Sequence, residues 1–217
     1  MNRKGVADTA GSVALGAWAA FSVLALFAAG RDGAPLWLDH GLLTWSVGHR
    51  PGTASAMARG VTASGTGVVP YLLAVLAGLV AGRTARDRLL AAALCVACLA
   101  LGQTLRYAVM EWVHRPRPPH SDWTAHASGW SFPSGHTTTA FLTAGLLIAA
   151  LTVRRPRGGT ALRTAVGCWG LAVAATRVFL GVHWFTDVVG GFLFALGWLT
   201  TCLFAAARRP PGRLLAA

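Results

Sequence analysis

Six apolar runs constrain the fold of this chain more than any other feature, because most of them are long enough to cross a lipid bilayer as a helix. About 20 helical residues span a hydrocarbon core of about 30 Å. The runs cover residues 12–30, 68–82, 89–113, 137–153, 164–180 and 184–207. The sequence therefore predicts an all-α fold, a polytopic membrane helix bundle with about six transmembrane helices.

Composition and length agree with one membrane-embedded domain. Hydrophobic residues make up 54% of the 217 residues and charged residues 12%, and the mean hydropathy is +0.54, above that of water-soluble domains. The length suits one compact bundle, so we expect a single domain over residues 1–217. Residues 36–59 contain His, Arg, Pro and Gly, and they predict one or two short interfacial helices after the first span.

Lysine and arginine residues predict the orientation of the bundle, because they collect on the cytoplasmic side of membrane proteins. With six spans and both termini cytoplasmic, twelve of the 19 basic residues lie inside and the other seven outside. We therefore expect a multi-pass protein of the plasma membrane. The net charge of +12 requires no nucleic-acid partner, since the inner basic residues would lie beside anionic lipid.

Two features admit a second interpretation. The first run could be a cleaved signal peptide, because Arg3 and Lys4 precede it and the sequence FAAG resembles a cleavage site. Cys95 and Cys98 form a C-x-x-C pattern, but inside an apolar run without a second pair nearby this pattern indicates helix packing rather than a metal site.

Three short polar segments carry the candidate chemistry, and the predicted orientation places all of them on the outer face. They are VHRPRPP at residues 113–119, WSFPSGH at 130–136 and ATRVFLGVHWFTD at 175–187. In the third segment, His183 and Asp187 would share one face of a helix that begins near His183. A carboxylate that accepts one imidazole N–H leaves the other nitrogen free to act as a nucleophile. Arg177 would join this pair at the membrane boundary.

The other two segments are suited to bind an anion. Ser134 and Gly135 precede a predicted helix whose first N–H groups are unpaired, and His136 would lie at the rim of this anion site, placed to deliver a proton. Arg115 and Arg117 alternate with prolines in a stiffened segment and offer guanidinium groups to phosphate oxygens. Taken separately, each segment also fits an ordinary helix cap, an interfacial salt bridge or a surface charge patch.

Together, an anion cradle, a nucleophile with its orienting acid and a proton donor predict a phosphoryl-transfer site. We expect no metal and no other cofactor, because the acidic residues of the outer side are too scattered to form a carboxylate cage. These residues are Asp32, Asp39, Glu111, Asp122 and Asp187. Arginines would then neutralise the phosphate oxygens.

The three segments resemble the three signatures of the type 2 phosphatidic acid phosphatase family, which belongs to the superfamily that also contains vanadium haloperoxidases. The matching residues are Arg117-Pro118, Pro133 to His136, and Arg177-x5-His183-x3-Asp187, and the resemblance covers about residues 36–207. It implies that His183 is the nucleophile that forms a phosphohistidine, that Asp187 is its partner and that His136 protonates the leaving group. The residues that it implies in phosphate binding are Arg117, Ser134, Gly135 and Arg177.

Two positions depart from the family pattern. Thr176 stands where the family usually has a serine before the third-segment arginine, and it keeps the hydroxyl group. Met110 stands where the family has a lysine, seven residues before Arg117, so one phosphate contact is in question. Arg106, one helical turn before Met110, is the candidate for the missing cation, and Arg115 is a further candidate for phosphate binding.

We therefore expect a metal-independent membrane enzyme that hydrolyses a lipid phosphate or diphosphate through a phosphohistidine, with its site on the extracytoplasmic face. The substrate classes implied by the resemblance are undecaprenyl diphosphate, phosphatidate and phosphatidylglycerol phosphate. Two alternatives stay open: a catalytically impaired lipid-phosphate binding or transport protein on the same fold, and a vanadate-dependent, haloperoxidase-like enzyme.

Overall fold

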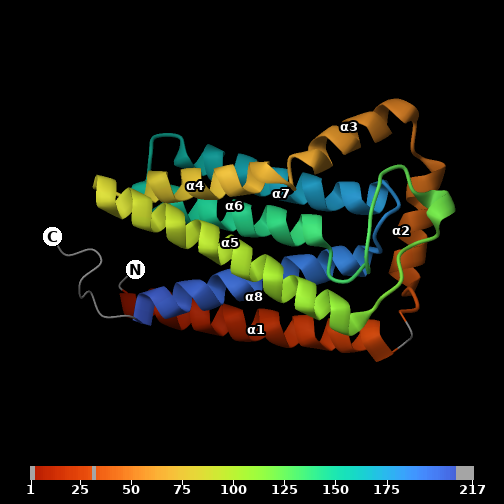
Figure 1. Cartoon of the computed structure of the whole chain (residues 1–217), viewed down its shortest axis with the longest axis horizontal. Helices are drawn as coiled ribbons and strands as arrows, with labels where there is room; N and C mark the ends of the chain where they lie inside the picture. Colours follow the sequence, from red (N-terminus) through yellow and green to blue (C-terminus); the bar gives the residue numbers. More distant parts are fainter. Residues whose placement is uncertain (1–2, 31–32, 209–217) are drawn as a thin grey trace.

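The computed structural model describes residues 3–30 and 33–208, and these residues form eight α-helices and one short 3₁₀ turn. The helices are α1 (Arg3–Gly30), α2 (Trp37–Gly48), α3 (Gly52–Ala63), α4 (Val68–Ala81), α5 (Ala85–Val113), α6 (Gly135–Arg154), α7 (Gly159–Phe179) and α8 (Phe185–Arg208). The 3₁₀ turn η1 covers His120–Asp122. They form an elongated bundle, with α2 lying across one end (Figure 1).

Four of these helices, α1, α5, α6 and α8, are long and apolar enough to cross a membrane. The pair α3 and α4 becomes a fifth candidate if it counts as one span, bent by 49° at a short break. Helix α7 has 21 residues, but its Thr, Gly and Arg residues make it less apolar than those four. The prediction of an all-helical, multi-pass membrane protein is confirmed, with four or five candidate spans in residues 3–30 and 33–208 rather than six.

Several helix boundaries differ from the sequence-based expectation, and three of them bear on the site or on the membrane spans. The polar stretch at residues 36–59 forms two helices as expected, but α3 continues to Ala63 and leads into α4. Helix α7 begins at Gly159 rather than near residue 164, because Gly158 adopts a left-handed conformation (φ 73°) that turns the chain into the helix. Helix α8 begins at Phe185, so His183 lies in the turn before the helix and not in its first turn.

The two ends of the bundle have different compositions. The start of α1, the end of α8 and the α4–α5 and α6–α7 connections lie at one end, and the three polar segments lie at the other, beside α2 (Figure 1). The basic residues expected on the inner side therefore lie far from the polar segments along the bundle axis; those among the described residues are Arg3, Lys4, Arg83, Arg86, Arg88, Arg154, Arg155, Arg157, Arg163 and Arg208.

An aromatic cluster anchors one of the polar segments to the bundle. Helix α1 lies along α8, and between them Phe21 contacts Phe194 with ring centroids 5.4 Å apart. Phe132, which belongs to the WSFPSGH segment, stacks on Phe21 at 5.7 Å and is fully buried. Gly190 of α8 makes this approach possible, since a Cβ atom there would overlap the Phe132 ring. The apolar core thus fixes the segment that leads into α6.

Candidate active site

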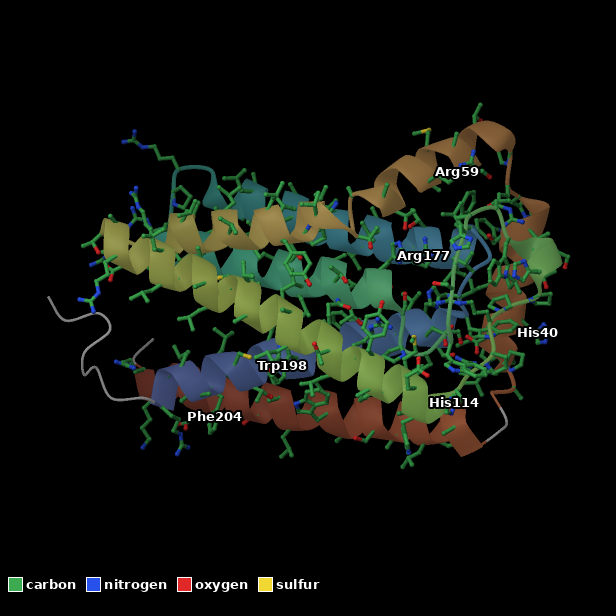
Figure 2. The ribbon with its side chains drawn as sticks, viewed as in Figure 1. His40, Arg59, His114, Arg177, Trp198 and Phe204 are labelled. Atoms are coloured by element: carbon green, nitrogen blue, oxygen red, sulfur yellow. The ribbon has the colours of Figure 1, made fainter. Side chains whose placement is uncertain are left out.

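The three polar segments meet at the end of the bundle that α2 covers. The first begins where α5 ends and His114 turns the chain with a left-handed conformation (φ 51°). Backbone hydrogen bonds join the segments: Ser131 N–H donates to the Arg115 carbonyl oxygen (2.8 Å), and Ser134 N–H donates to the Asp187 carbonyl oxygen (3.0 Å). Arg177 of α7 lies among the polar side chains gathered at this end, whereas Trp198 of α8 lies nearer the middle of the bundle (Figure 2).

His183 is held between a carboxylate and a guanidinium group. Its Nδ1 lies 3.3 Å from Asp187 Oδ2, and its Nε2 lies 3.0 Å from Arg117 Nη1. Since a guanidinium group has only donors, Nε2 accepts this hydrogen bond and the ring proton is on Nδ1, facing Asp187. Burial, reinforced by the positive charges of Arg117 and Arg177, lowers the pKa of His183 well below its ordinary value. The imidazole is therefore neutral at pH 7, with its lone pair on Nε2.

Asp187 is fully buried, and donors surround its carboxylate. Besides His183, Oδ2 accepts a hydrogen bond from the backbone N–H of Trp184 (2.9 Å), and Oδ1 accepts one from Arg115 Nη1 (2.6 Å). The bond from Trp184 is the kind that an acidic residue in the first turn of a helix makes with the residue before the helix. Asp187 therefore reaches back from α8 to His183, although His183 is not part of that helix.

The start of α6 is arranged to receive an anion. Ser134 precedes the helix and is fully buried, yet its side chain does not cap the helix N-terminus. Ser134 Oγ accepts a hydrogen bond from Thr137 Oγ1 (3.0 Å), an arrangement in which Ser134 can donate its own proton to a ligand. His136, in the first turn, is partly buried and lies within electrostatic range of His183 and of the guanidinium groups around it. Unpaired N–H groups at a helix start attract negative charge.

Two buried guanidinium groups lie near this helix start. Arg177, 1% exposed, donates from Nη1 to Thr62 Oγ1 of α3 (2.9 Å). Arg106, 4% exposed, places its guanidinium carbon 3.4 Å from the position that a Cβ atom would take on Gly135, and its Nη1 lies 3.2 Å from Met110 Sδ. Within the described residues, Nε of both arginines has no hydrogen-bond partner. A buried donor without an acceptor is costly, so both groups are suited to an anionic ligand.

Arg117 and Arg115 have different surroundings, although only one residue separates them. Arg117 donates to His183 and to carbonyl oxygens of the neighbouring loops; these belong to Val182, Ser128, Gly129 and Trp130. Arg115, 2% exposed, binds Asp39 and the Asp187 oxygen that His183 does not contact. The two carboxylates occupy its guanidinium group, which lies on the side of Asp187 away from His183. Arg115 therefore does not lie with the groups suited to phosphate.

Comparison with known proteins decides the family. A family model described as the PAP2 superfamily matches residues 91–210, more than half of the chain. The chain belongs to the PAP2 superfamily. Its fold resembles a crystal structure described as the first transmembrane PAP2-type phosphatidylglycerolphosphate phosphatase from Bacillus subtilis. The TM-score is 0.75 and the sequence identity 24%, over 91% of this chain and 98% of the other.

Curated relatives of this PAP2 chain carry the names of phosphatases. Phosphatidylglycerophosphatase B of Bacillus subtilis (strain 168) is 30% identical over 132 residues, which are 59% of this chain and 63% of the relative. The lipid A 1-phosphatases of Rhizobium etli and Rhizobium johnstonii are 33% and 32% identical over 43% of this chain. The matched region spans 41% and 39% of those two proteins, so it covers less than two thirds of each relative.

Most of the residues that the sequence singled out in this PAP2 chain lie around one site, with Arg115 set apart from the phosphate-binding candidates. Asp39 and Thr186 were not foreseen as part of the site. Both accept a hydrogen bond from Arg115, and the Thr186 hydroxyl also contacts Asp39. Asp39 lies 76 residues before Arg115, and no motif or spacing connects the two positions. In the part of the chain that the structure describes, no group of three His, Cys, Asp or Glu residues is placed to hold a metal ion.

Proposed function

We propose that this PAP2 chain is a membrane phosphatase that hydrolyses lipid phosphates or diphosphates through a phosphohistidine on His183. One observation carries the proposal: the lone pair of a buried, neutral His183 is on Nε2, because Arg117 donates to that atom while Asp187 holds Nδ1. A neutral imidazole oriented by a carboxylate is an activated nucleophile. Buried guanidinium groups and an uncapped helix start nearby supply the attraction for a phosphate.

In the proposed first step, Nε2 of His183 attacks the terminal phosphorus, and the bond from that phosphorus to the oxygen of the leaving group breaks; this is the ester oxygen of a monophosphate or the bridging oxygen of a diphosphate. His136 donates a proton to that oxygen, so the lipid leaves as an alcohol, or as a lipid monophosphate if the substrate is a diphosphate. Asp187 stabilises the positive charge that develops on the His183 ring. Arg117 must exchange its bond to Nε2 for a phosphate oxygen when substrate binds, since one lone pair cannot serve both.

In the proposed second step, water attacks the phosphorus of the phosphohistidine, and the bond between phosphorus and Nε2 breaks. His136 now takes a proton from the water, which restores both histidines and releases inorganic phosphate. Negative charge on the transferring group is stabilised by Arg177, by Arg106 and by Ser134 with the first N–H groups of α6, beginning at Gly135. Resident cations and helix N–H groups need no reorganisation during the reaction, which is why such sites accelerate it.

The names of the relatives favour a lipid phosphomonoester. Phosphatidylglycerol phosphate is the substrate class that one relative's name states, and the 1-phosphate of lipid A is that of two others. Phosphatidate and undecaprenyl diphosphate share the same chemistry, a phosphate or diphosphate on an apolar chain. The bilayer would present all of these headgroups at the membrane surface, beside the end of the bundle that carries the site.

Phosphate release by purified protein tests this function. We expect release from at least one of phosphatidylglycerol phosphate, phosphatidate and undecaprenyl diphosphate, unchanged by EDTA and inhibited by vanadate, which adopts the five-coordinate geometry of phosphoryl transfer. Loss of activity in EDTA that added Mg²⁺ restores would contradict the metal-independent mechanism. Binding of all three lipids without phosphate release would instead indicate the impaired binding protein, and halide oxidation that requires vanadate would indicate the haloperoxidase-like enzyme.

The proposed membrane arrangement has six spans, with the bent pair α3 and α4 as the second and α7 as the fifth. Helix α7 contacts α6 and α3, so protein covers part of its polar surface. An even number of spans puts both termini on one side, and the basic residues at the end opposite the site assign that side to the cytoplasm. The active site would then face the extracytoplasmic side of the plasma membrane.

Labelling of single cysteines tests the orientation. Ser121, at the site end, and Arg157, in the α6–α7 connection, are both exposed. In a background in which the four native cysteines are alanine, Ser121→Cys should react with a membrane-impermeant maleimide from outside intact cells. Arg157→Cys should react only after the cells are opened, because the positive-inside distribution places it in the cytoplasm. The opposite labelling pattern would reverse the proposed topology.

A further inference from the structure

Asp39 of α2 is fully buried beside the candidate active site, and the proposed mechanism does not use it. Its Oδ1 accepts a hydrogen bond from Thr186 N–H (2.8 Å), and its Oδ2 accepts bonds from Arg115 Nη2 (2.8 Å) and from Leu36 N–H (3.0 Å). The Thr186 hydroxyl also contacts both carboxylate oxygens, at 2.9 and 2.8 Å. Asp39 is thus tied to the residue that directly precedes Asp187.

Arg115 connects this carboxylate to the site. Its Nη2 binds Asp39, and its Nη1 binds both Asp187 Oδ1 (2.6 Å) and Thr186 Oγ1 (2.7 Å). Its Nε donates to the Gly33 carbonyl oxygen at 3.4 Å. Each nitrogen of the guanidinium group therefore has a protein acceptor. A continuous buried chain of contacts runs from His183 through Asp187 and Arg115 to Asp39.

The charges in this chain explain why a second carboxylate matters. A guanidinium group bound to Asp187 alone would neutralise that carboxylate and weaken its attraction for the Nδ1 proton of His183. Asp39 binds Nη2 of Arg115, while Asp187 binds Nη1. Two carboxylates therefore share one cation, and Asp39, Arg115 and Asp187 together carry one net negative charge when both carboxylates are ionised. Buried charges interact strongly because little water screens them. The surplus negative charge lies where the His183 ring becomes positive during phosphorylation.

We infer that Asp39 is a positioning residue for phosphoryl transfer, which holds Arg115 and Thr186 so that Asp187 keeps its negative charge toward His183. This inference rests on the proposed function and deepens it, because it assigns a catalytic consequence to the helix that lies across the end of the bundle. Asp39 touches neither His183 nor the groups suited to phosphate, so its effect on the reaction passes through Arg115 and Asp187. It should therefore influence turnover much more than substrate binding.

Asp39→Asn tests the inference, with Asp122→Asn as the matched control. Asp122 lies at the same end of the bundle, but within the described residues its carboxylate accepts a side-chain hydrogen bond only from the Ser121 hydroxyl (3.4 Å). With phosphatidate in mixed micelles, we expect Asp39→Asn to lower kcat at least tenfold, to leave KM within about threefold, and to slow phosphoenzyme formation by the same factor as kcat. Asp122→Asn should match the unsubstituted protein. A kcat for Asp39→Asn within twofold of that protein would overturn the inference.

Asp39→Ala separates charge from shape. This variant leaves space beside Arg115 that a small carboxylate can fill, so added formate should restore part of kcat, whereas neutral formamide of similar size should not. Equal recovery with formate and formamide would show that Asp39 only fills space, and would overturn the inference. Activity of the unsubstituted protein in the same assay reports on the phosphatase function itself. A failure of the inference is thereby distinguished from a failure of the proposed function.

Discussion

We expect His183→Ala to abolish formation of the phosphoenzyme, whereas His136→Ala should still become phosphorylated slowly by a substrate with a good leaving group. The first substitution removes the proposed nucleophile, and we expect kcat/KM to fall by at least about four orders of magnitude. The second removes only the proposed proton donor. It should lower kcat/KM roughly 10²–10⁴-fold with a lipid substrate, but only slightly with an aryl phosphate whose leaving group needs no proton.

Burst kinetics with an activated aryl phosphate measure both variants. His49→Ala is the matched control, because His49 is exposed at the end of α2 and its ring stacks on Trp45 of the same helix. In His136→Ala, the rate constant of the burst, which reports formation of the phosphoenzyme, should stay constant from about pH 8 to about pH 6. The proposed nucleophile is the neutral ring, and the lowered pKa of His183 favours the neutral ring over this pH range. A histidine with the ordinary pKa of about 6.5 would lose more than half of its neutral form at pH 6. Complete loss of the burst in both histidine variants would show that their roles are wrongly assigned.

We expect Arg106→Ala to lower kcat/KM at least tenfold, equivalent to about 1.4 kcal/mol, and the addition of Met110→Lys to restore much of the loss. Arg106 lies against Gly135 at the start of α6 and contacts Met110, which occupies the position where the family resemblance implies a lysine. Its guanidinium group can therefore supply the cation that Met110 lacks. Loss of a charge-assisted hydrogen bond to phosphate costs about 1.5–3 kcal/mol, which is consistent with the expected fall.

Arg59→Ala is the matched control for this prediction. Arg59 also lies at the site end of the bundle, but it is exposed and donates to the Thr124 carbonyl oxygen (3.2 Å). Thermal unfolding of both variants in detergent would show whether they remain folded. If folded Arg106→Ala keeps the kcat/KM of the unsubstituted protein, Arg106 does not act as the phosphate-binding cation.

Much of the candidate site was predictable because its residues lie close together in the sequence. Neighbours along the chain need little tertiary information to meet: Ser134, Gly135 and His136 stand at a helix start, and Asp187 lies one helical turn beyond His183. The exact helix boundary was the weaker part of this prediction, since His183 precedes α8 rather than opening it. Asp187 still reaches it, because an acidic side chain in a first helical turn points back toward the N-terminus.

The roles of the arginines required the tertiary structure. Arg115 and Arg117 belong to one Arg-Pro repeat and have the same local sequence chemistry, yet Arg117 contacts His183 and Arg115 contacts Asp39 and Asp187. A guanidinium group carries donors on a long flexible stem, so the acceptors that surround it decide its role. Those acceptors come from segments that only the folded bundle brings together.

By itself, the sequence determined that the chain is a helical membrane protein and which short segments carry its chemistry. Apolar runs of helix-spanning length and motifs of closely spaced residues are local properties, and local properties can be derived from residue order. The tertiary structure decided the bend between α3 and α4, the direction of Arg106 toward Gly135 and the place of Asp39 behind Asp187. Each of these depends on packing between helices distant in the chain, where contact energies outweigh the preferences of any single segment.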